Sequence, residues 1–306
     1  MKFKFIISKW GNFAFFVQNL SNWHFSCRQN YNLLWEKELG KLSPEEKRAL
    51  ETFKKVRSRF PSGKTFFEQS FFTKKDPWKN IKKNLSSQDY KAIEKTFLML
   101  NDRFQILYKQ DYPSLKIWQE NLKKRNNELL SKKITKILRL LYNTHNKTKK
   151  IINVYLLFSS IDQRGGGANI DEKSISIEVS RQPLALIDYM IGIIWHEVIH
   201  LCFDKEYFLS LVQKKFPEDW KTISLIKEMT AISLFPKGIL ANKFLKINTS
   251  QKETLHLKLP VKYNRQLLSI TDSYVKQQKP FDEKYIDQLY TIISNLNKKE
   301  KCCTLE

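Results

Sequence analysis

Glycine and proline are scarce in this chain of 306 residues, which contains eight glycines and nine prolines. Tight turns depend on these two residues, so their scarcity favours long helices over a β-sandwich or a β-barrel. Hydrophobic residues make up 42% of the chain, which is typical of a globular protein and not of a disordered one. A chain of this length provides enough core for one or two domains.

The first half of the chain has a helical pattern. Aromatic residues are frequent up to about residue 40, and we interpret them as packing or docking surface. Ser43 followed by Pro44 and two glutamates predicts the start of a helix. Further helices are expected to begin near Ser86 and Pro113. A polar, basic stretch over 143–150 is typical of a linker, so we expect an all-α N-terminal region of unknown role over residues 1–145.

The pattern changes after this stretch. Short β-prone runs at 153–158 and 174–179 flank a glycine-rich segment, and the second run alternates with the period of two of a half-buried strand. The helices expected after these runs cover 183–203, 220–235 and 282–296. Pro236 and Gly238 end the second of them. The sequence therefore predicts an α+β, mostly helical protein, in which residues 146–306 form a domain with a small sheet and a helical C-terminal part.

Residues 196–200 carry the strongest chemical signal, His196-Glu197-Val198-Ile199-His200. In this H-E-x-x-H pattern, one helix supplies two zinc ligands and a general base. On a helical wheel the two histidines are about 40° apart and roughly 6 Å apart along the axis, so that both imidazoles can reach one ion. Both lie opposite the apolar stripe of the helix. The alternative, a pair of ordinary cleft histidines, is less consistent with the intervening glutamate.

A catalytic zinc ion needs a third protein ligand and an open fourth position for water. Asp204 lies one further turn along the helix, too far to reach the same ion easily, and we expect it to contact a ligand instead. Glu228 lies at the edge of the apolar stripe of the helix 221–235. A buried carboxylate needs a cation, and a metal at the histidines would supply it. The alternative is a Glu228–lysine pair across the core.

Together these residues resemble the gluzincin clan of zinc metallopeptidases over about residues 150–240. The run Glu228-Met229-Thr230-Ala231 is similar to the Glu-x-x-Ala around their third ligand. The longer metzincin pattern is not present, because Phe203 and Glu206 stand where it needs glycine and histidine. No glycine follows Glu228 and the aminopeptidase-type strand motif is not matched, so the resemblance does not imply exopeptidase activity.

The glycine-rich segment also resembles the substrate-binding edge strand of these peptidases. Gly166, Gly167, Ala168 and Asn169 would there pair through their backbone with an extended peptide. The alternative for the glycines is a flexible turn. The resemblance therefore implies a zincin-like catalytic domain that acts on a peptide or protein.

The site that the resemblance implies holds one Zn²⁺ per chain on His196, His200 and Glu228, with Glu197 as the general base. The residue that stabilises the oxyanion stays open, and the candidates are Tyr263, Arg265, Tyr274 and His256.

The net charge of +23 raises the alternative of a nucleic-acid partner. The excess consists of 44 lysines against 10 arginines, and the lysines are scattered. Surfaces that read phosphate more often use the bidentate fork of arginine, so we favour a solvated basic surface. The second hypothesis is a basic nucleic-acid-associated or regulatory protein whose metal site is structural or vestigial.

The four cysteines are Cys27, Cys202, Cys302 and Cys303, and their spacing indicates neither a disulfide framework nor a cysteine zinc site. A reducing compartment fits this usage. Lys9 interrupts the apolar start of the chain and no cleavage signal follows, so we expect a cytoplasmic protein. No run of 18 apolar residues predicts a membrane span. The sequence does not indicate the oligomeric state.

Overall fold

The computed structural model describes residues 1–23, 27–60, 66–73, 75–144, 151–159, 165–169, 174–247 and 261–303. The N-terminal elements are β1 (Lys2–Ile6), α1 (Lys9–Ser21), α2 (Gln29–Leu39), α3 (Pro44–Arg57), α4 (Phe66–Thr73), α5 (Trp78–Asn84), α6 (Ser87–Arg125) and α7 (Glu128–Leu141). The following elements are β2 (Ile151–Leu157), β3 (Gly166–Asn169), β4 (Ser174–Glu178), the 3₁₀ helix η1 (Leu184–Leu186), α8 (Ile187–Cys202), α9 (Tyr207–Lys215), α10 (Trp220–Leu234), α11 (Ile239–Phe244), α12 (Val261–Gln277) and α13 (Glu283–Cys303).

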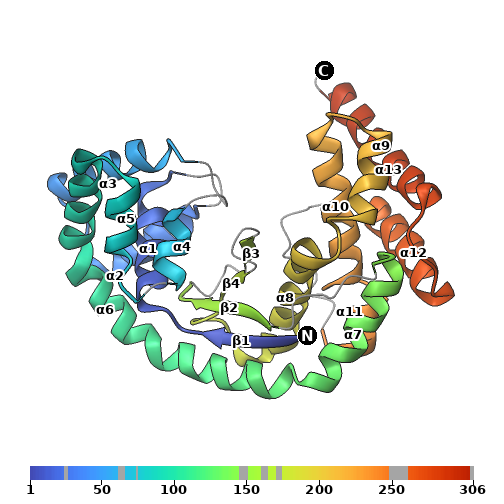
Figure 1. The fold of residues 1–306 in the computed structure, drawn as a ribbon, viewed down its shortest axis with the longest axis horizontal. Helices are drawn as coiled ribbons and strands as arrows, with labels where there is room; N and C mark the ends of the chain where they lie inside the picture. Colours follow the sequence, from blue (N-terminus) through green and yellow to red (C-terminus); the bar gives the residue numbers. More distant parts are fainter. Residues whose placement is uncertain are drawn as a thin grey trace.

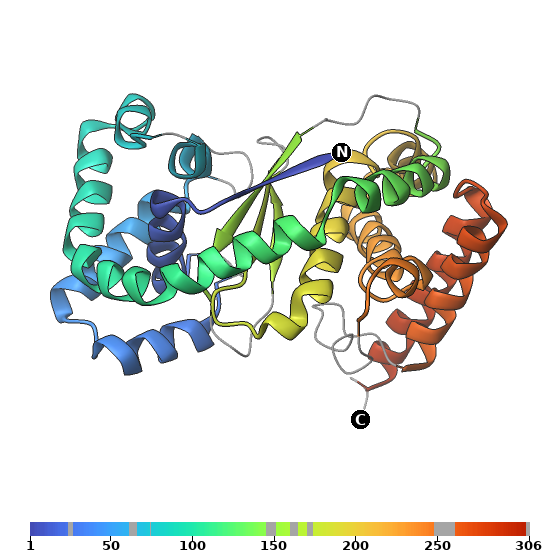
Figure 2. The ribbon, with the colours of Figure 1, turned by 90° about the horizontal axis from the view of Figure 1, so that it is seen from below.

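The molecule has the shape of a U (Figure 1). Helices α1 to α5 form one arm, and α9 to α13 form most of the other. The sheet lies at the base between the arms, and the long helix α6 runs along the base from one arm toward the other, as both ribbon views show (Figures 1 and 2). The arms are therefore joined by one continuous helix as well as by the sheet.

Within the described residues, the sheet has four strands in the order β1-β2-β4-β3. Strands β1, β2 and β4 are parallel, and β3 pairs antiparallel with β4 at the edge. Strand β1 corrects the prediction of an all-α N-terminal region. The alternation of Lys2 and Lys4 with Phe3 and Phe5 is the period-two pattern of a half-buried strand, and Phe5 is buried.

Two hydrophobic cores support the arms. One gathers mostly aromatic side chains of α1 to α6, including Phe13 stacked on Phe104 at 4.2 Å between ring centroids. The other surrounds the sheet, α8 and the C-terminal helices. Tyr108 of α6 packs against both cores, so the two cores meet at this residue. The predicted packing role of the N-terminal aromatics is confirmed for Phe13 and Trp35, which are buried.

Several predicted elements are confirmed. Strands β2 and β4 and helix α10 form where the sequence predicts them, and Ser43 caps α3 with the expected capping box with Glu46. The predicted helix start at Pro113 is wrong, because Pro113 lies inside the continuous α6. Leu107 and Leu115, on either side of it, are fully buried, and this packing holds the helix together across the proline. Most of the predicted linker 143–150 lies outside the described residues.

Helix α8, which carries the H-E-x-x-H pattern, is buried almost all round. The expectation that it packs only one stripe into the core is wrong, since His196 and His200 are 6% and 8% exposed. Within the described residues, the stretch Leu184–Cys202 is long and apolar enough to cross a membrane, but 78% of its most apolar window is buried in the fold. The core helix of a globular protein meets the same criteria of length and composition. The burial of α8 on nearly all sides places it at the centre of the molecule.

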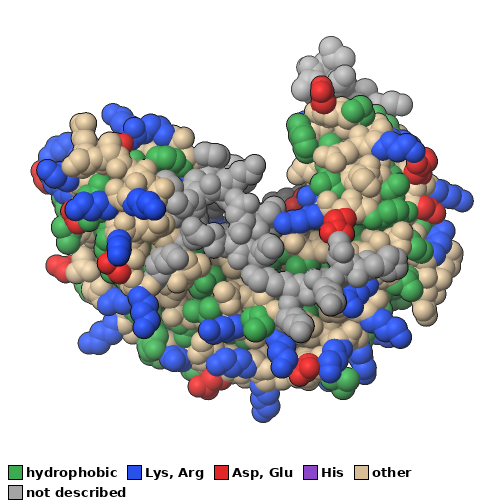
Figure 3. Space-filling view, in the orientation of Figure 1, with side chains coloured by type: hydrophobic (Ala, Val, Ile, Leu, Met, Phe, Trp, Pro, Cys, Tyr) green, Lys and Arg blue, Asp and Glu red, His purple; other side chains and the backbone are tan. Residues whose placement is uncertain are grey.

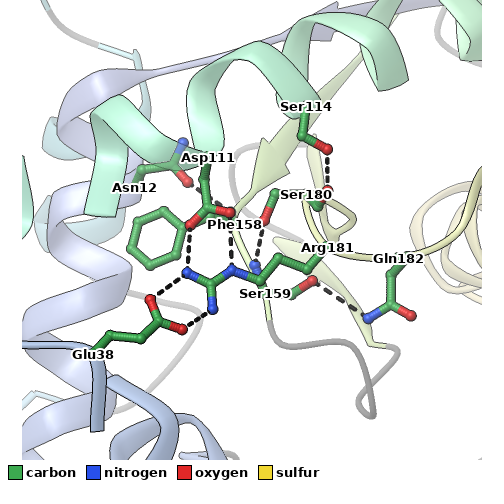
Figure 4. Close-up of polar contacts among 9 residues, drawn as sticks. All are labelled: Asn12, Glu38, Asp111, Ser114, Phe158, Ser159, Ser180, Arg181 and Gln182. Atoms are coloured by element: carbon green, nitrogen blue, oxygen red, sulfur yellow. Dashed lines mark hydrogen bonds and ion pairs between the residues drawn. The ribbon is translucent and has the colours of Figure 1, made fainter. Parts of the chain in front are cut away.

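The turn between β4 and η1 is fixed by the N-terminal arm (Figure 4). Arg181 in this turn pairs with Asp111 of α6 through its Nε at 3.0 Å, and it also pairs with Glu38 of α2. The neighbouring Ser180 accepts a hydrogen bond at its Oγ from the backbone N–H of Ser159, 2.8 Å away. Since α8 begins a few residues later, the N-terminal arm helps to set where the H-E-x-x-H helix starts.

We expect Asp111→Ala to lower the free energy of unfolding by about 2 kcal/mol, because Arg181 loses two charged hydrogen bonds to Asp111 while it keeps its pairing with Glu38. The side chains of Arg181 and Asp111 are 14% and 4% exposed. Lys214→Ala is the control, since it breaks the Lys214–Glu283 pair, whose side chains are 76% and 63% exposed. That change should cost at most about 0.5 kcal/mol. Urea unfolding measures both variants, and equal losses would contradict a structural role for Arg181.

Candidate metal centre

Helices α8 and α10 bring His196, His200 and Glu228 together. The Nε2 atoms of the two histidines are 3.2 Å apart. Glu228 places one carboxylate oxygen 3.3 Å from Nε2 of His196 and the other 3.3 Å from Nε2 of His200. The three predicted residues thus each offer a metal-ligating atom, and these atoms lie within 4.8 Å of one another.

The other ring nitrogen of each histidine contacts the protein. Nδ1 of His200 lies 2.7 Å from the carboxylate of Asp204, and Nδ1 of His196 lies 3.3 Å from the backbone carbonyl of Phe235. Such contacts fix the tautomer and the ring orientation, so that Nε2 is the nitrogen available to a metal. Asp204 was expected to contact one of the predicted ligands, and it contacts His200.

The carbonyl of Phe235 is available because α10 ends at Leu234, and the last carbonyls of a helix have no partner within it. The close approach of this helix end to α8 depends on Gly192. A Cβ atom at Gly192 would lie 2.7 Å from Cβ of Pro236, which is too close for an ordinary contact. Glycine at this position of α8 therefore allows the Phe235 carbonyl to come within reach of His196.

The ligand separations fit a zinc ion. Two ligands that bind zinc tetrahedrally at about 2.0–2.1 Å are about 3.3 Å from each other. The two Nε2 atoms are 3.2 Å apart, and each lies 3.3 Å from a different carboxylate oxygen of Glu228, so each of these separations is close to that length. Two histidines and one glutamate are also a donor set used by catalytic zinc sites. The residues present therefore fit the metal that the sequence predicts, while the identity of the ion is not fixed by the geometry.

Asp204 and Glu228 set the charge of the cluster. Burial alone would lower the pKa of His200, but hydrogen bonds and negative charge from Asp204 and Glu228 outweigh it and raise the pKa to about 10. Burial also opposes ionisation of Glu228, yet hydrogen bonds from the two histidines hold its pKa well below the usual range. A cation that takes these ligands must displace the His200 proton, so protons and metal compete for the site.

Glu228 is more exposed than a position at the edge of the apolar stripe suggests, since its side chain is 45% exposed. Its partners are the two histidines and not the lysine that the sequence offered as the alternative. The lysine beside it contacts a different group, because Nζ of Lys227 lies 3.4 Å from the carboxylate of Asp204. Asp204 thus links the histidine helix α8 to the glutamate helix α10.

Glu197 lies on the face of α8 that meets the edge strand β3. A Cβ atom built on Gly166 would lie 3.5 Å from Oε1 of Glu197 and 2.6 Å from Cγ2 of Ile193. Gly166 therefore allows the strand to pass closer to α8 than any other residue would. The glycine-rich segment forms a strand at the sheet edge, as the resemblance implies, and its backbone passes beside the carboxylate of Glu197.

The described contacts do not connect any of the oxyanion candidates to the cluster. Tyr274 donates a hydrogen bond to Asp282 at 2.5 Å, and Arg265 is exposed on α12. Tyr263 is buried on the same helix. His256 lies outside the described residues, as do the side chains of Ala168 and Asn169. Among the described contacts, none selects one of the four candidates.

The sequence reasoning missed three groups that support the site. They are Lys227, the carbonyl of Phe235 and Gly192. A glycine in the middle of an apolar helix is a signal for close backbone approach and could have identified Gly192. The other two depend on how α8 and α10 cross, which has no local sequence signal.

Neither a protein-family model nor a curated protein nor a solved structure matches this chain.

We expect Asp204→Asn to weaken zinc binding by about 10- to 100-fold, because loss of its charge loosens the orientation of His200 and lowers its basicity. Asp219→Asn is a matched control on the same helix pair, since Asp219 caps the exposed start of α10 and asparagine caps helices equally well. Competition with a chromogenic chelator measures both affinities. Unchanged affinity in the Asp204 variant would show that this contact does not tune the site.

Proposed function

We propose that this protein is a zinc-dependent peptidase. The observation that carries the proposal is the convergence of His196, His200 and Glu228 at zinc-like separations, with Glu197 beside a glycine-rich edge strand. A hydrolytic zinc site needs these parts: three ligands, a general base and a place for the substrate. The proposal includes one Zn²⁺ per chain and a gluzincin-type arrangement.

Zn²⁺ held by these ligands would lower the pKa of a coordinated water toward about 7 and polarise the substrate carbonyl. Glu197 would accept the proton of that water and pass it to the leaving amine. Glu197 suits this role because it is the least buried residue of the five-residue motif and faces β3. Asp204 keeps the imidazole of His200 oriented throughout the reaction.

The substrate would bind as an extended peptide along β3. This strand is the last in the sheet, and among the described residues no further strand pairs with its outer side. A peptide can extend the sheet there through backbone hydrogen bonds, which are tolerant of sequence. The space-filling view shows a wide notch between the two arms of the molecule (Figure 3).

A purely structural metal site fits the geometry less well. Structural zinc sites are closed by four protein ligands, whereas the ligand group found among the described residues has three members. A nucleic-acid partner would be tested by the salt dependence of binding, which is steep when lysines release counterions from phosphates. The site itself supports hydrolysis.

The purified protein should contain about one zinc per chain and cleave an unstructured protein such as fluorescently labelled casein. Glu197→Gln should keep the metal but lose activity by about 10²-fold or more, since the general base is removed. Glu228→Ala should lose most of the metal. Metal content is measured by mass spectrometry, and hydrolysis is measured by fluorescence after reconstitution with zinc.

Full activity of the Glu197 variant would overturn the mechanism. Zinc bound equally by the wild type and by the Glu228 variant would remove Glu228 from the ligand set. Zinc bound by both the wild type and the Glu197 variant, with hydrolysis by neither, would favour the structural alternative.

Gly166→Ala should lower kcat/KM by about 10²-fold without loss of zinc, because the new methyl group collides with Ile193 and moves the strand away from Glu197. Gly167→Ala is the matched control, since its Cβ atom would meet Ser176 Oγ at an ordinary 3.6 Å. Steady-state hydrolysis of the same substrate measures both variants. Equal effects of the two substitutions would count against β3 as the substrate strand.

A further inference from the structure

A groove of about 460 Å³ lies between α7, α11 and α12. Leu141 and Leu240 on its floor are buried, and Ile137, Phe244 and Val275 around them are partly exposed. A volume of this size with a mainly apolar lining is typical of a small-molecule site. None of the metal ligands lines this groove, so a site there is independent of the proposed peptidase.

Lysines surround this apolar floor. Lys133 and Lys136 are one turn apart on the same face of α7, and Lys243 comes from α11. The ammonium of Lys243 lies 5.7 Å from the centroid of the Phe244 ring, at the edge of the floor. Among the described residues that line the groove, none is an aspartate or a glutamate. The groove therefore combines an apolar floor with an uncompensated positive rim.

The wall of the groove is held in place from below. The backbone carbonyl of Phe244 accepts a hydrogen bond from Arg125 at 3.1 Å, and Arg125 pairs with Asp188 of α8 at 2.6 Å. Asp188 also accepts a hydrogen bond from the backbone N–H of Lys246 at 2.8 Å. These contacts tie α11 to the central helix, so the groove is formed before any ligand arrives.

We propose that this groove binds a fatty acid anion, with the acyl chain on the apolar floor and the carboxylate among the three lysines. Each methylene buried there should strengthen binding about fourfold. The ammonium groups attract a carboxylate but repel a cationic headgroup. A helix of a partner protein is a poorer occupant. It is about 10 Å wide with its side chains, so more than one turn of it exceeds the volume of the groove.

The test is calorimetric titration of the full-length protein with laurate below its micelle concentration. Saturable binding of about one laurate per chain is expected. Dodecyltrimethylammonium, which has the same chain and the opposite charge, should bind at least about tenfold more weakly.

Variants then locate the site. The triple change Lys133→Gln, Lys136→Gln and Lys243→Gln should weaken laurate binding at least tenfold. The matched control, Lys91→Gln, Lys95→Gln and Lys109→Gln on exposed positions of α6, removes the same charge elsewhere and should leave binding unchanged. Val275→Trp should fill the apolar floor and weaken laurate binding. Leu140→Glu should also weaken it, and this position is 38% exposed, so that the substitution does not change the core.

Three results would overturn the proposal. The first is the absence of saturable laurate binding, including the case in which sedimentation shows instead that two chains associate through this face. The second is equal loss in the two lysine triples, which would mean attraction by net charge alone. The third is unchanged binding in both the Val275 and the Leu140 variant, which would place the ligand outside the groove.

Discussion

The candidate metal centre depends on how closely α8 packs against the end of α10. Gly192 removes the side chain that would keep the two helices apart, and the carbonyl of Phe235 then reaches Nδ1 of His196. On the other side of the cluster, Asp204 contacts both His200 and Lys227. The two helices are thus joined by contacts on either side of the three ligands. Because α8 is buried almost all round, a shift of either helix would disturb the sheet and the ligands together.

The N-terminal half of the chain is part of this framework. Strand β1 pairs with β2 in the sheet, and α6 contributes to both hydrophobic cores. Arg181 links the turn before α8 to α2 and α6. The segment 150–240, which carries the candidate metal centre, does not complete its own sheet or core. The N-terminal arm therefore acts at least as a scaffold for the half of the chain that holds this centre.

The sequence predicted the parts of the site that follow a short-range pattern. The helical spacing of His196 and His200 fixes their common face, and the end of α10 at Pro236 placed Glu228 on a helix of known length. The strand at Gly166 was expected only from the resemblance to the edge strand of zinc peptidases, because the glycines alone were equally consistent with a turn. The continuation of α6 through Pro113 and the pairing of Arg181 with Asp111 could not be predicted. They depend on which distant residues come together, and helix propensity alone favours a break at proline.

The geometry of the three ligands also bears on how tightly a metal would bind. The Nε2 atoms of the two histidines are 3.2 Å apart, which suits two ligands of one zinc ion, and each histidine is oriented by a contact of its other nitrogen. Zinc sites that form only on folding use part of the binding free energy to order the chain. Here the core around α8 and α10 supplies that order, and a metal that binds must displace the proton that Asp204 and Glu228 favour on His200.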